Sequence, residues 1–439
     1  MSVQDYGAGD EFDVIVLGAG ISGLVSSSIV ERQGAKSILV VDEYPHVGGN
    51  HIDQSCGSYT FDIGSFIFQS DSPLLGHFPE MLPHYLEIAP TFGRLNPQGV
   101  VAKYPLSVRE DLVNAGPLEL CRILASVVYA RLFYRKLKNA HSFARYWIGE
   151  RLLKRSGLEH YMQRFYGVDA TQIDLNFARK RMLWIQENAS ILAYVRRLNV
   201  PRRPARQHGK QLARPREGFA PLYAVAKQQL EARRVSFLLG QSMAGITRVD
   251  GVFRVEVGGD IFRTRRLIST IPIRRIQELC GLVPEDRLQT VKMISLFFSF
   301  SGKRGFLQSI LFNFSHGGAW KRLTMYSDFY GTSQGREFFA VEVNAAAVGD
   351  SVDRAETDFR QHIAANGLFG GDLKLEGSHS VGTAYPIYTN KASERADAAI
   401  KELRDFGIES LGRQGAFDYQ PTVWTSTIAA ETTLARGSG

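Results

Sequence analysis

Cysteine is scarce in this sequence. Only three cysteines, Cys56, Cys121 and Cys280, occur among 439 residues. They are too few and too far apart for a disulfide framework or a cysteine-rich metal site, so we expect three buried, reduced thiols and no metal centre. The first residues, MSVQDYGAGDEF, are acidic and polar, whereas a secretory signal begins with basic residues and continues with apolar ones. We therefore expect a cytoplasmic protein.

Long hydrophobic runs are also absent. A transmembrane helix needs about 20 consecutive apolar residues, but the best candidate run, Ile123–Ala130, is bounded by Arg122 and Arg131. The sequence thus predicts no transmembrane segment. The pattern favours a helix that faces the core and keeps its arginines in water, and it leaves open peripheral contact with an anionic membrane. The basic residues that flank the run are Arg122, Arg131, Arg135, Lys136 and Lys138.

Basic residues exceed acidic ones by 52 to 44, and much of the excess lies in one stretch. Between Arg196 and Arg216 the chain reads RRLNVPRRPARQHGKQLARPR. Its prolines interrupt a long helix and its charges oppose a dry core, so we predict an exposed, mobile loop that binds phosphates or a membrane surface. Aromatic residues are missing from this stretch, which argues against single-stranded nucleic acid as a partner.

A strand–helix–strand unit opens the chain. Phe12–Leu17 is a short apolar run typical of a buried strand, a helix-like segment follows, and Ser37–Val41 is a second apolar run that ends at Asp42. Three glycines, Gly18, Gly20 and Gly23, stand between the first strand and the helix.

This glycine spacing is typical of a dinucleotide-binding turn. Gly18 permits the tight turn, Gly20 lets the backbone approach a pyrophosphate, and Gly23 allows close packing of helix and strand. The helix N-terminus offers free N–H groups to the pyrophosphate, and Asp42 can accept hydrogen bonds from a ribose. The sequence therefore predicts a dinucleotide at this turn.

The residues after Asp42 point to the kind of dinucleotide. The chain continues with VDEYPHVGGNH and then with YTFDIG, which carry a second glycine doublet and an F-D-x-G element. This order resembles flavin-dependent amine oxidases, protoporphyrinogen oxidases and UDP-galactopyranose mutases. The resemblance implies FAD as the cofactor, with NAD(P)H as a candidate reductant. The cofactor-binding residues that it implies are Gly18, Gly20, Ile21, Ser22, Gly23, Asp42, Glu43, Gly48, Gly49, Asn50, Asp62, Gly64, Gly412 and Arg413.

The expected fold class is α/β, with a Rossmann-type FAD-binding domain, a helical insertion and an antiparallel β-sheet substrate domain. Internal repeats are absent, which excludes a solenoid or propeller. A period of about 3.6 residues from Pro117 to Arg181 predicts several helices. We expect the FAD-binding domain at residues 1–80, 210–275 and 376–439, the helical insertion with its basic loop at 81–209, and the substrate domain at 276–375.

Two further motifs resemble the mutases, which act on nucleotide sugars. Ala384-Tyr385-Pro386-Ile387 is similar to their Y-Y-P-I, and Gly412-Arg413-x-Gly415-x-Phe417-x-Tyr419 is similar to their G-R-x-G-T-Y-x-Y. The resemblance implies that Arg322, Tyr385 and Tyr419 position the substrate. The alternative is that Arg322 lies on the surface of a strand and that Tyr385 and Tyr419 are core residues. The residues that it implies for a mobile substrate loop are Arg202, Arg203, Arg214 and Arg216.

Two departures leave the chemistry open. Where the mutases have G-P-H-I-F-H, this chain has GSFIFQ at residues 64–69, without either histidine, and where they have Y-x-D it has Tyr419-Gln420-Pro421. His46 and His51 show no metal-binding spacing, so we expect structural roles for both. The favoured function is ring contraction or a related isomerisation of a nucleotide-linked sugar through flavin N5, in glycan or secondary-metabolite biosynthesis.

The alternatives remain a protoporphyrinogen oxidase-type or amine oxidase-type enzyme, with Phe66 and Phe68 in an apolar pocket, and a flavin-binding protein without turnover. The sequence predicts a small-molecule substrate and gives no oligomeric state.

Overall fold

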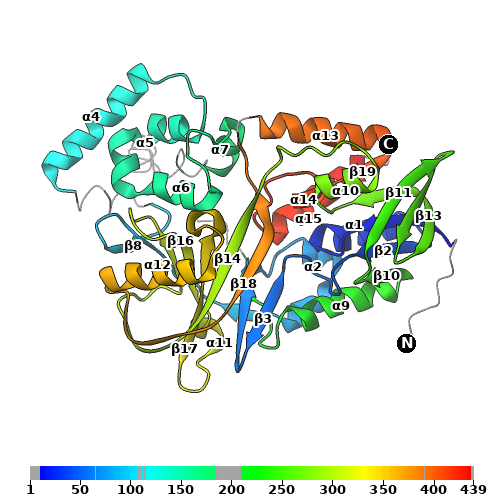
Figure 1. Cartoon of the computed structure of the whole chain (residues 1–439), viewed down its shortest axis with the longest axis horizontal. Helices are drawn as coiled ribbons and strands as arrows, with labels where there is room; N and C mark the ends of the chain where they lie inside the picture. The colour runs from blue at the N-terminus through cyan, green and yellow to red at the C-terminus, as the bar shows by residue number, and fades with distance from the viewer. Residues whose placement is uncertain are drawn as a thin grey trace.

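The computed structural model describes residues 10–64, 66–106, 111, 115–182, 185, 209–389 and 391–436. It contains two seven-stranded sheets. Figure 1 shows the sheets next to each other, with a group of helices from residues 117–181 beyond the second sheet. The expected fold class, with a Rossmann-type domain, a helical insertion and an antiparallel sheet, is confirmed.

The first sheet has a parallel centre, in the order β10-β2-β1-β13, and β19 also pairs with β13 in parallel. β2 and the C-terminal half of β1 are buried, because α1 packs on both strands and α9 packs on β10, as continuous apolar strands predict. α15 packs on α1. β12 and β11 extend the sheet on one side as an antiparallel hairpin. These elements are β1 (Glu11–Leu17), α1 (Ile21–Arg32), β2 (Ile38–Asp42), α9 (Phe219–Glu231), β10 (Val235–Leu239), β11 (Met243–Val249), β12 (Val252–Val257), β13 (Asp260–Ser269), β19 (Ile408–Ser410) and α15 (Val423–Arg436).

The second sheet has the order β18-β14-β17-β16-β15-β7-β8 and is antiparallel except where β15 meets β7. Phe298 and Phe339 pack on its outer face against Phe359 of the covering helix α12. Some strands of this sheet lie outside the range expected for the substrate domain, residues 276–375. β7 and β8 come from the expected helical insertion, and β18 continues to Pro386. These elements are β7 (Phe92–Leu95), β8 (Val101–Lys103), β14 (Thr290–Arg304), β15 (Ile310–Asn313), β16 (Trp320–Met325), β17 (Glu337–Asn344), α12 (Val352–Ala365) and β18 (Phe369–Pro386).

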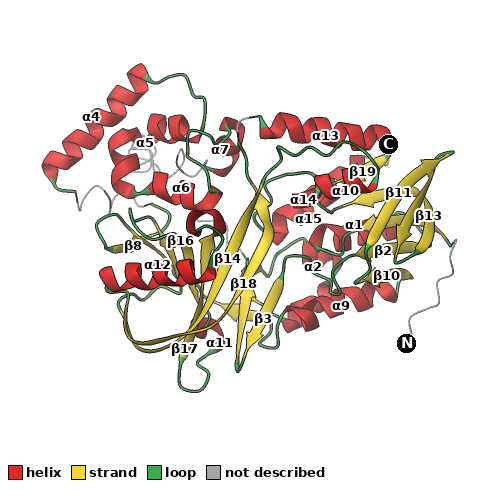
Figure 2. Ribbon diagram, in the orientation of Figure 1, coloured by secondary structure: helices red, strands yellow, loops and turns green. Residues whose placement is uncertain are grey.

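The described residues of the insertion form the helices α4 (Pro117–Phe133), α5 (Ala140–Ser156), α6 (Leu158–Tyr166) and α7 (Leu175–Arg181), as the 3.6-residue period predicted. Figure 2 shows them gathered at one end of the molecule, with α4 outermost. Asn139 caps α5 by accepting a hydrogen bond from the Ser142 N–H at 2.9 Å. α5 is kinked at Gly149, where a Cβ would lie 2.9 Å from the Val127 nitrogen, so glycine lets α4 approach α5 closely.

The exposure of α4 corrects two expectations. Ile123 and Ala130 are buried, but most of the helix surface is exposed, so α4 is not a core-facing helix with only its arginines in water. Cys121 is exposed on it, and Cys56 and Cys280 are half-buried, so the expectation of three buried thiols was wrong. The reason is that α4 packs mainly on α5 among the described elements, with one face. None of the described helices is long and apolar enough to cross a bilayer.

The basic stretch is only partly an exposed loop. Gln211–Ala213 form β9, the central strand of a small sheet, and Arg214 is only 1% exposed because its guanidinium forms an ion pair with the buried Asp62. The expectation of an exposed loop was therefore wrong for residues 211–214, since a buried carboxylate compensates the arginine. Arg216 is exposed, and Arg202 and Arg203 lie outside the described residues.

The remaining elements connect these layers. β3 (Ile52–Cys56) and β4 (Tyr59–Ile63) form a hairpin, and β5 (Phe68–Gln69) and β6 (Leu86–Ile88) flank β9. The short helices are α2 (Leu74–His77), η1 (Pro79–His84), α10 (Ile273–Leu279), α11 (Ser327–Tyr330), η3 (Ala345–Val348) and α14 (Gly412–Gly415), and α13 (Ala392–Phe406) is longer.

Candidate active site

The glycine turn between β1 and α1 is built by close backbone contacts. Gly18 has φ +101°, a conformation that favours glycine, and its N–H donates to the Val41 carbonyl at 2.7 Å. A Cβ at Gly23 would lie 1.8 Å from the Gly18 oxygen, so only glycine fits there. The Gly48 N–H donates to the Ala19 carbonyl at 2.9 Å, which brings the second glycine doublet against the first turn.

Asp42 ends β2 beside this turn and is almost fully buried. Its carboxylate accepts hydrogen bonds from the Ala19 N–H at 2.6 Å and from the Tyr44 N–H at 2.9 Å. Burial raises the pKa of Asp42, and these two bonds act in the opposite direction. A carboxylate has about four acceptor sites, so Asp42 keeps capacity for hydroxyl groups of a ligand. The neighbouring Glu43 binds Arg275 through one carboxylate oxygen at 2.6 Å.

A first cavity of about 350 Å³ lies above the carboxyl ends of β1 and β2, where open α/β sheets bind their ligands. Most of the cofactor-binding residues expected from the sequence line it: Gly18, Gly20, Ile21, Ser22, Asp42, Glu43, Gly48, Gly49, Asn50 and Arg413.

The other four expected cofactor-binding residues lie elsewhere. Gly23 packs behind the turn, and Gly412 lies against Ser22, where a Cβ would be 2.7 Å from the hydroxyl oxygen. Gly64 lines a second cavity. Asp62 is buried and holds Arg214, and burial raises its pKa to about 6 although the Arg214 charge opposes this.

The second cavity, of about 240 Å³, adjoins the first. The structure brings Arg322, Tyr385 and Tyr419 together on its walls, although they come from β16, β18 and the segment after α14. Its walls are rich in aromatic rings. The residues that line both cavities are Asn50, His51, Arg413, Gln420 and Pro421.

Two cations share one carboxylate in this second cavity. Lys321 Nζ lies 2.8 Å from Glu342 Oε2, and Arg322 forms an ion pair with the other oxygen of Glu342. Burial favours the neutral form of Glu342, but the charges of Arg322 and Lys321 outweigh it and lower its pKa. Arg322 also donates to the Gly64 carbonyl at 2.6 Å. Tyr385 donates its hydroxyl hydrogen to the Phe165 carbonyl and packs its ring against Phe165 and Lys321.

Arg413 faces both cavities and makes no hydrogen bond or ion pair with any described residue. Burial lowers its pKa, but a guanidinium remains charged at physiological pH. Buried polar atoms in the walls that have neither a hydrogen bond nor an ion pair with a described residue include Arg322 Nε, Tyr388 Oη and Gln420 Oε1. Because buried polar groups are nearly always paired in proteins, these atoms have hydrogen-bonding capacity for a polar ligand.

His51 is a site residue that the sequence did not identify. It lines both cavities, and its Nδ1 lies 2.5 Å from the Tyr223 hydroxyl oxygen. Burial, together with the charge of Arg413, lowers the pKa of His51 to about 3, so the ring is neutral at physiological pH. The sequence feature that could have identified His51 as a site residue is its position directly after Gly48, Gly49 and Asn50.

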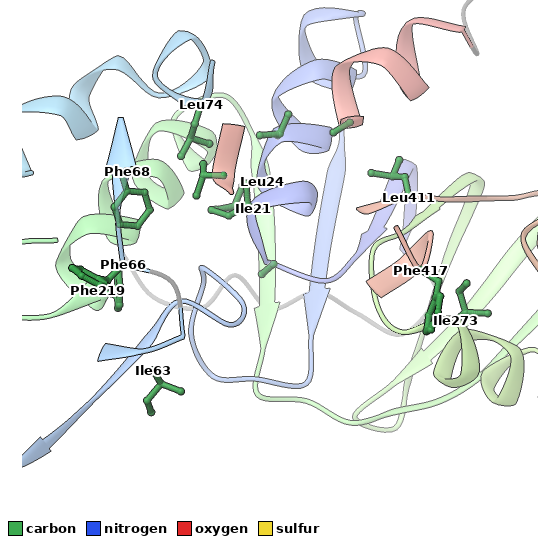
Figure 3. Close-up of a cluster of buried hydrophobic side chains, with 14 of the residues drawn as sticks. Ile21, Leu24, Ile63, Phe66, Phe68, Leu74, Phe219, Ile273, Leu411 and Phe417 are labelled. Atoms are coloured by element: carbon green, nitrogen blue, oxygen red, sulfur yellow. The ribbon is translucent and has the colours of Figure 1, made fainter. Parts of the chain in front are cut away.

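Phe66 and Phe68 do not form an apolar pocket. Both are buried, and neither lines either cavity. Figure 3 shows them near Phe219 in the hydrophobic core, and Phe66 also packs edge-to-face on Tyr326. The aromatic walls of the second cavity come instead from Tyr104, Tyr161, Phe165, Phe312, Tyr385, Tyr388 and Tyr419.

Comparison with known proteins agrees with this architecture. Residues 16–80 match the family model of the NAD(P)-binding Rossmann-like domain. A UDP-galactopyranose mutase of Mycoplasma pneumoniae is 38% identical over 74 residues, which cover 16% of this chain and 18% of the mutase. The chain thus aligns with less than a fifth of that relative.

Solved structures align over nearly the whole chain. A reduced UDP-galactopyranose mutase has a TM-score of 0.76 and 16% identity, covering 98% of this chain and 95% of its own. A putative protoporphyrinogen oxidase from Exiguobacterium sp. 255-15 has a TM-score of 0.72 and 16% identity, covering 97% of this chain and 98% of its own. The chain therefore has the fold of these enzymes, as its motifs predicted.

Proposed function

We propose that this chain is an FAD-dependent enzyme that isomerises a nucleotide-linked sugar. FAD would occupy the first cavity, with its pyrophosphate over Gly20 and the N-terminus of α1 and a ribose at Asp42. The fit rests on the backbone approach of Gly20 to Gly49, where a Cβ would meet the Gly49 Cα at 3.6 Å, and on Arg413, which has no partner among the described residues. The flavin ring would reach the wall that both cavities share.

The charge of the second cavity supports a phosphorylated substrate. Lys321, Arg322 and Arg413 line it, whereas Glu342 is the one acidic side chain among its described lining residues. A buried site with more positive than negative charge is stabilised by an anion, and a guanidinium suits phosphate oxygens. The aromatic walls would pack on the sugar or base rings. This excess of cations is the observation that carries the proposal.

Reduced flavin, when bound, supplies a nucleophilic N5 and is regenerated at the end of an isomerisation. The residues of this chain would position the sugar beside the flavin and stabilise the charge of the departing phosphate, a task for Arg322 in particular. The half-buried, neutral His51 would help to exclude water from the wall between the cavities. None of these roles requires net oxidation of the substrate.

A titration tests the substrate class. UDP is added to the FAD-loaded protein while the flavin absorbance is followed, with uridine, which lacks phosphates, as the matched ligand. We expect a saturable change with UDP and at least about a tenfold weaker effect with uridine, because the arginines recognise the phosphates. Equal effects of the two ligands, or none with UDP, would contradict phosphate recognition.

One observation favours a second candidate, an oxidase or dehydrogenase. Glu342 already neutralises part of the charge of Lys321 and Arg322, and most of the described residues that line the cavity are apolar or aromatic. An apolar substrate that loses a hydride to the flavin would fit such walls. It would leave Arg322 Nε and Gln420 Oε1 without hydrogen bonds, for which reason we favour the nucleotide sugar.

A further inference from the structure

The outer face of α4 is apolar and exposed. Positions 118, 121, 125, 128 and 132 are spaced three and four residues apart and therefore share one face of the helix. Phe133 is 66% exposed and Leu118 is 65% exposed, although a surface helix of a globular protein normally turns polar residues to water. The exposed members of this face are Leu118, Cys121, Leu124, Ala125, Val128, Tyr129, Leu132 and Phe133.

The opposite face of α4 accounts for its packing on the protein. Ile123 and Ala130 are buried toward α5, and the Ser126 hydroxyl accepts a hydrogen bond from the Arg151 N–H at 3.1 Å. Arg131 stacks on the rings of Tyr146 and Trp147. The outer face takes no part in these contacts, and none of the described elements covers it. A contiguous apolar surface of this kind marks an interaction site.

Positive charge accompanies this face. Arg122 is exposed on it, and Arg135, Lys136 and Lys138 are exposed just beyond the C-terminal end of α4. Glu119 is the only acidic residue in residues 117–138, and Arg151 binds it through two hydrogen bonds, of 2.5 and 2.7 Å. The exposed rings of Tyr129 and Phe133 lie next to the basic end.

We propose that α4 docks the protein on an anionic lipid surface, with the outer face among the acyl chains and the basic residues at the phosphate level. Helices that lie in a membrane interface combine an apolar face with lysine and arginine, and aromatic rings favour the boundary. In a dimer formed through this surface, each α4 would contact the α4 of the other copy, which is also apolar and positively charged and has no free acidic residue. Charge complementarity therefore selects anionic lipid. The inference is independent of the reaction at the two cavities.

Vesicle binding tests the inference. The full-length, FAD-loaded protein is floated with vesicles of equal parts phosphatidylglycerol and phosphatidylcholine, and with phosphatidylcholine alone. We expect binding to the anionic vesicles that weakens with added salt, and about tenfold or more weaker binding to the neutral ones. Absence of binding to the anionic vesicles would overturn the proposal.

Two double variants separate the apolar and the charged contributions. Val128→Ser with Leu132→Ser removes exposed apolar groups, and Val283→Ser with Leu307→Ser is its matched control, because both of these side chains are more than 80% exposed elsewhere. Arg135→Gln with Lys136→Gln removes two charges, and Arg254→Gln with Arg265→Gln removes two from the first sheet, where both are exposed. We expect each α4 variant to lose about tenfold or more in vesicle affinity and each control to bind like the wild type.

A third variant gives a signal that does not depend on loss of binding. Tyr129→Trp places an indole on the outer face, and brominated lipid should quench its fluorescence in anionic vesicles. Wild-type vesicle affinity of both α4 double variants, or an unquenched indole, would overturn the proposal. So would a stable dimer that the Val128→Ser, Leu132→Ser protein fails to form, because the face would then serve a second copy of the chain.

Discussion

Gly20 and Gly23 stand in one turn, but the absence of a side chain serves a different purpose at each. A Cβ at Gly23 would lie 1.8 Å from the Gly18 oxygen, within the protein itself. At Gly20 a Cβ would make only ordinary contacts, the nearest at 3.6 Å, and φ is −73°, which any residue adopts. Gly23 is therefore required by the fold, whereas Gly20 keeps space in the first cavity.

Gly20→Val should accordingly weaken cofactor binding and preserve the fold. The valine methyl groups would occupy the space over the N-terminus of α1, so we expect FAD affinity to fall by about 100-fold, equivalent to about 2.7 kcal/mol. Titration of the apoprotein with FAD, followed by flavin fluorescence, measures this change. Gly76→Val, where a Cβ meets nothing within 4 Å, is the matched control. Unchanged FAD affinity in Gly20→Val would contradict the proposal that FAD binds in this cavity.

Arg322 contributes part of the positive charge of the second cavity, which we propose as the substrate site. It lines only the second cavity, so Arg322→Ala should retain FAD. Loss of the guanidinium opposite a phosphate should cost roughly 2–5 kcal/mol, or about 30- to 5,000-fold in kcat/KM for a nucleotide sugar. Arg336→Ala is the control, because Arg336 also pairs with a carboxylate, that of Asp372, but lines neither cavity. Full activity of Arg322→Ala with retained FAD would argue for the oxidase alternative.

Sequence reasoning succeeded at residues whose backbone geometry is local. Gly18, Gly20 and Asp42 follow from contacts over a few residues and one strand pairing, and all three line the first cavity. Arg214 was misread because its partner, Asp62, lies 152 residues away in the chain. His51 was missed for the same reason, since its environment depends on Tyr223 and Arg413.

Among the elements, α5 and α6 are joined by a titratable contact. His141 Nδ1 lies 2.6 Å from Glu159 Oε1, and Nε2 lies 3.6 Å from Glu150 Oε2. The hydrogen bond to Glu159 is the largest cause that raises the pKa of His141, and the same bond lowers the pKa of Glu159. The protonated histidine therefore stabilises the packing of these two helices.

The pH dependence has a defined sign. Because folding raises the pKa of His141 above its unfolded value of about 6.5, its contribution is complete below that pH and is lost as pH rises through the folded value. We expect the free energy of unfolding of His141→Gln to equal that of the wild type near pH 9 and to be up to about 1 kcal/mol lower near pH 6.

Urea unfolding at the two pH values measures this difference, and His84→Gln, a change at an exposed histidine, is the control. Comparison with a variant is needed because several other histidines, such as His51 and His77, have lowered pKa values and act in the opposite direction. A His141→Gln protein with the wild-type pH profile would contradict the assignment.

Helices and strands with strong local sequence patterns could be predicted. Short strands, and strands that depend on pairing partners far away in the sequence, could not. β1, α1 and β2 carry apolar runs and a glycine turn, so their order could be derived from the sequence. β7, β8 and β9 have three or four residues each, and β7 and β9 pair with strands far along the chain, which no local period reveals. α4 has the period of a helix, but the sequence does not show that only one of its apolar faces is covered.

At the scale of the whole molecule, the two cavities adjoin each other across a shared wall. Residues from the first domain, Asn50 and His51, line both cavities together with residues of the C-terminal segment. The second cavity is completed by β14, β16 and β18 of the second sheet. This arrangement places the proposed cofactor site beside the cation-rich cavity proposed for the substrate, which is the basis of the proposed isomerisation.

The reaction balance tests this account most directly. FAD-loaded protein, either oxidised or reduced with dithionite under anaerobic conditions, is mixed with UDP-hexoses, and the sugar isomers and the redox state of the flavin are measured, followed by oxygen uptake in air. The account predicts that the isomer forms only with reduced flavin, with no oxygen consumed per turnover, because the substrate undergoes no net oxidation. Reduction of the flavin by the substrate, with stoichiometric oxygen uptake in each cycle, would contradict it and support the oxidase alternative.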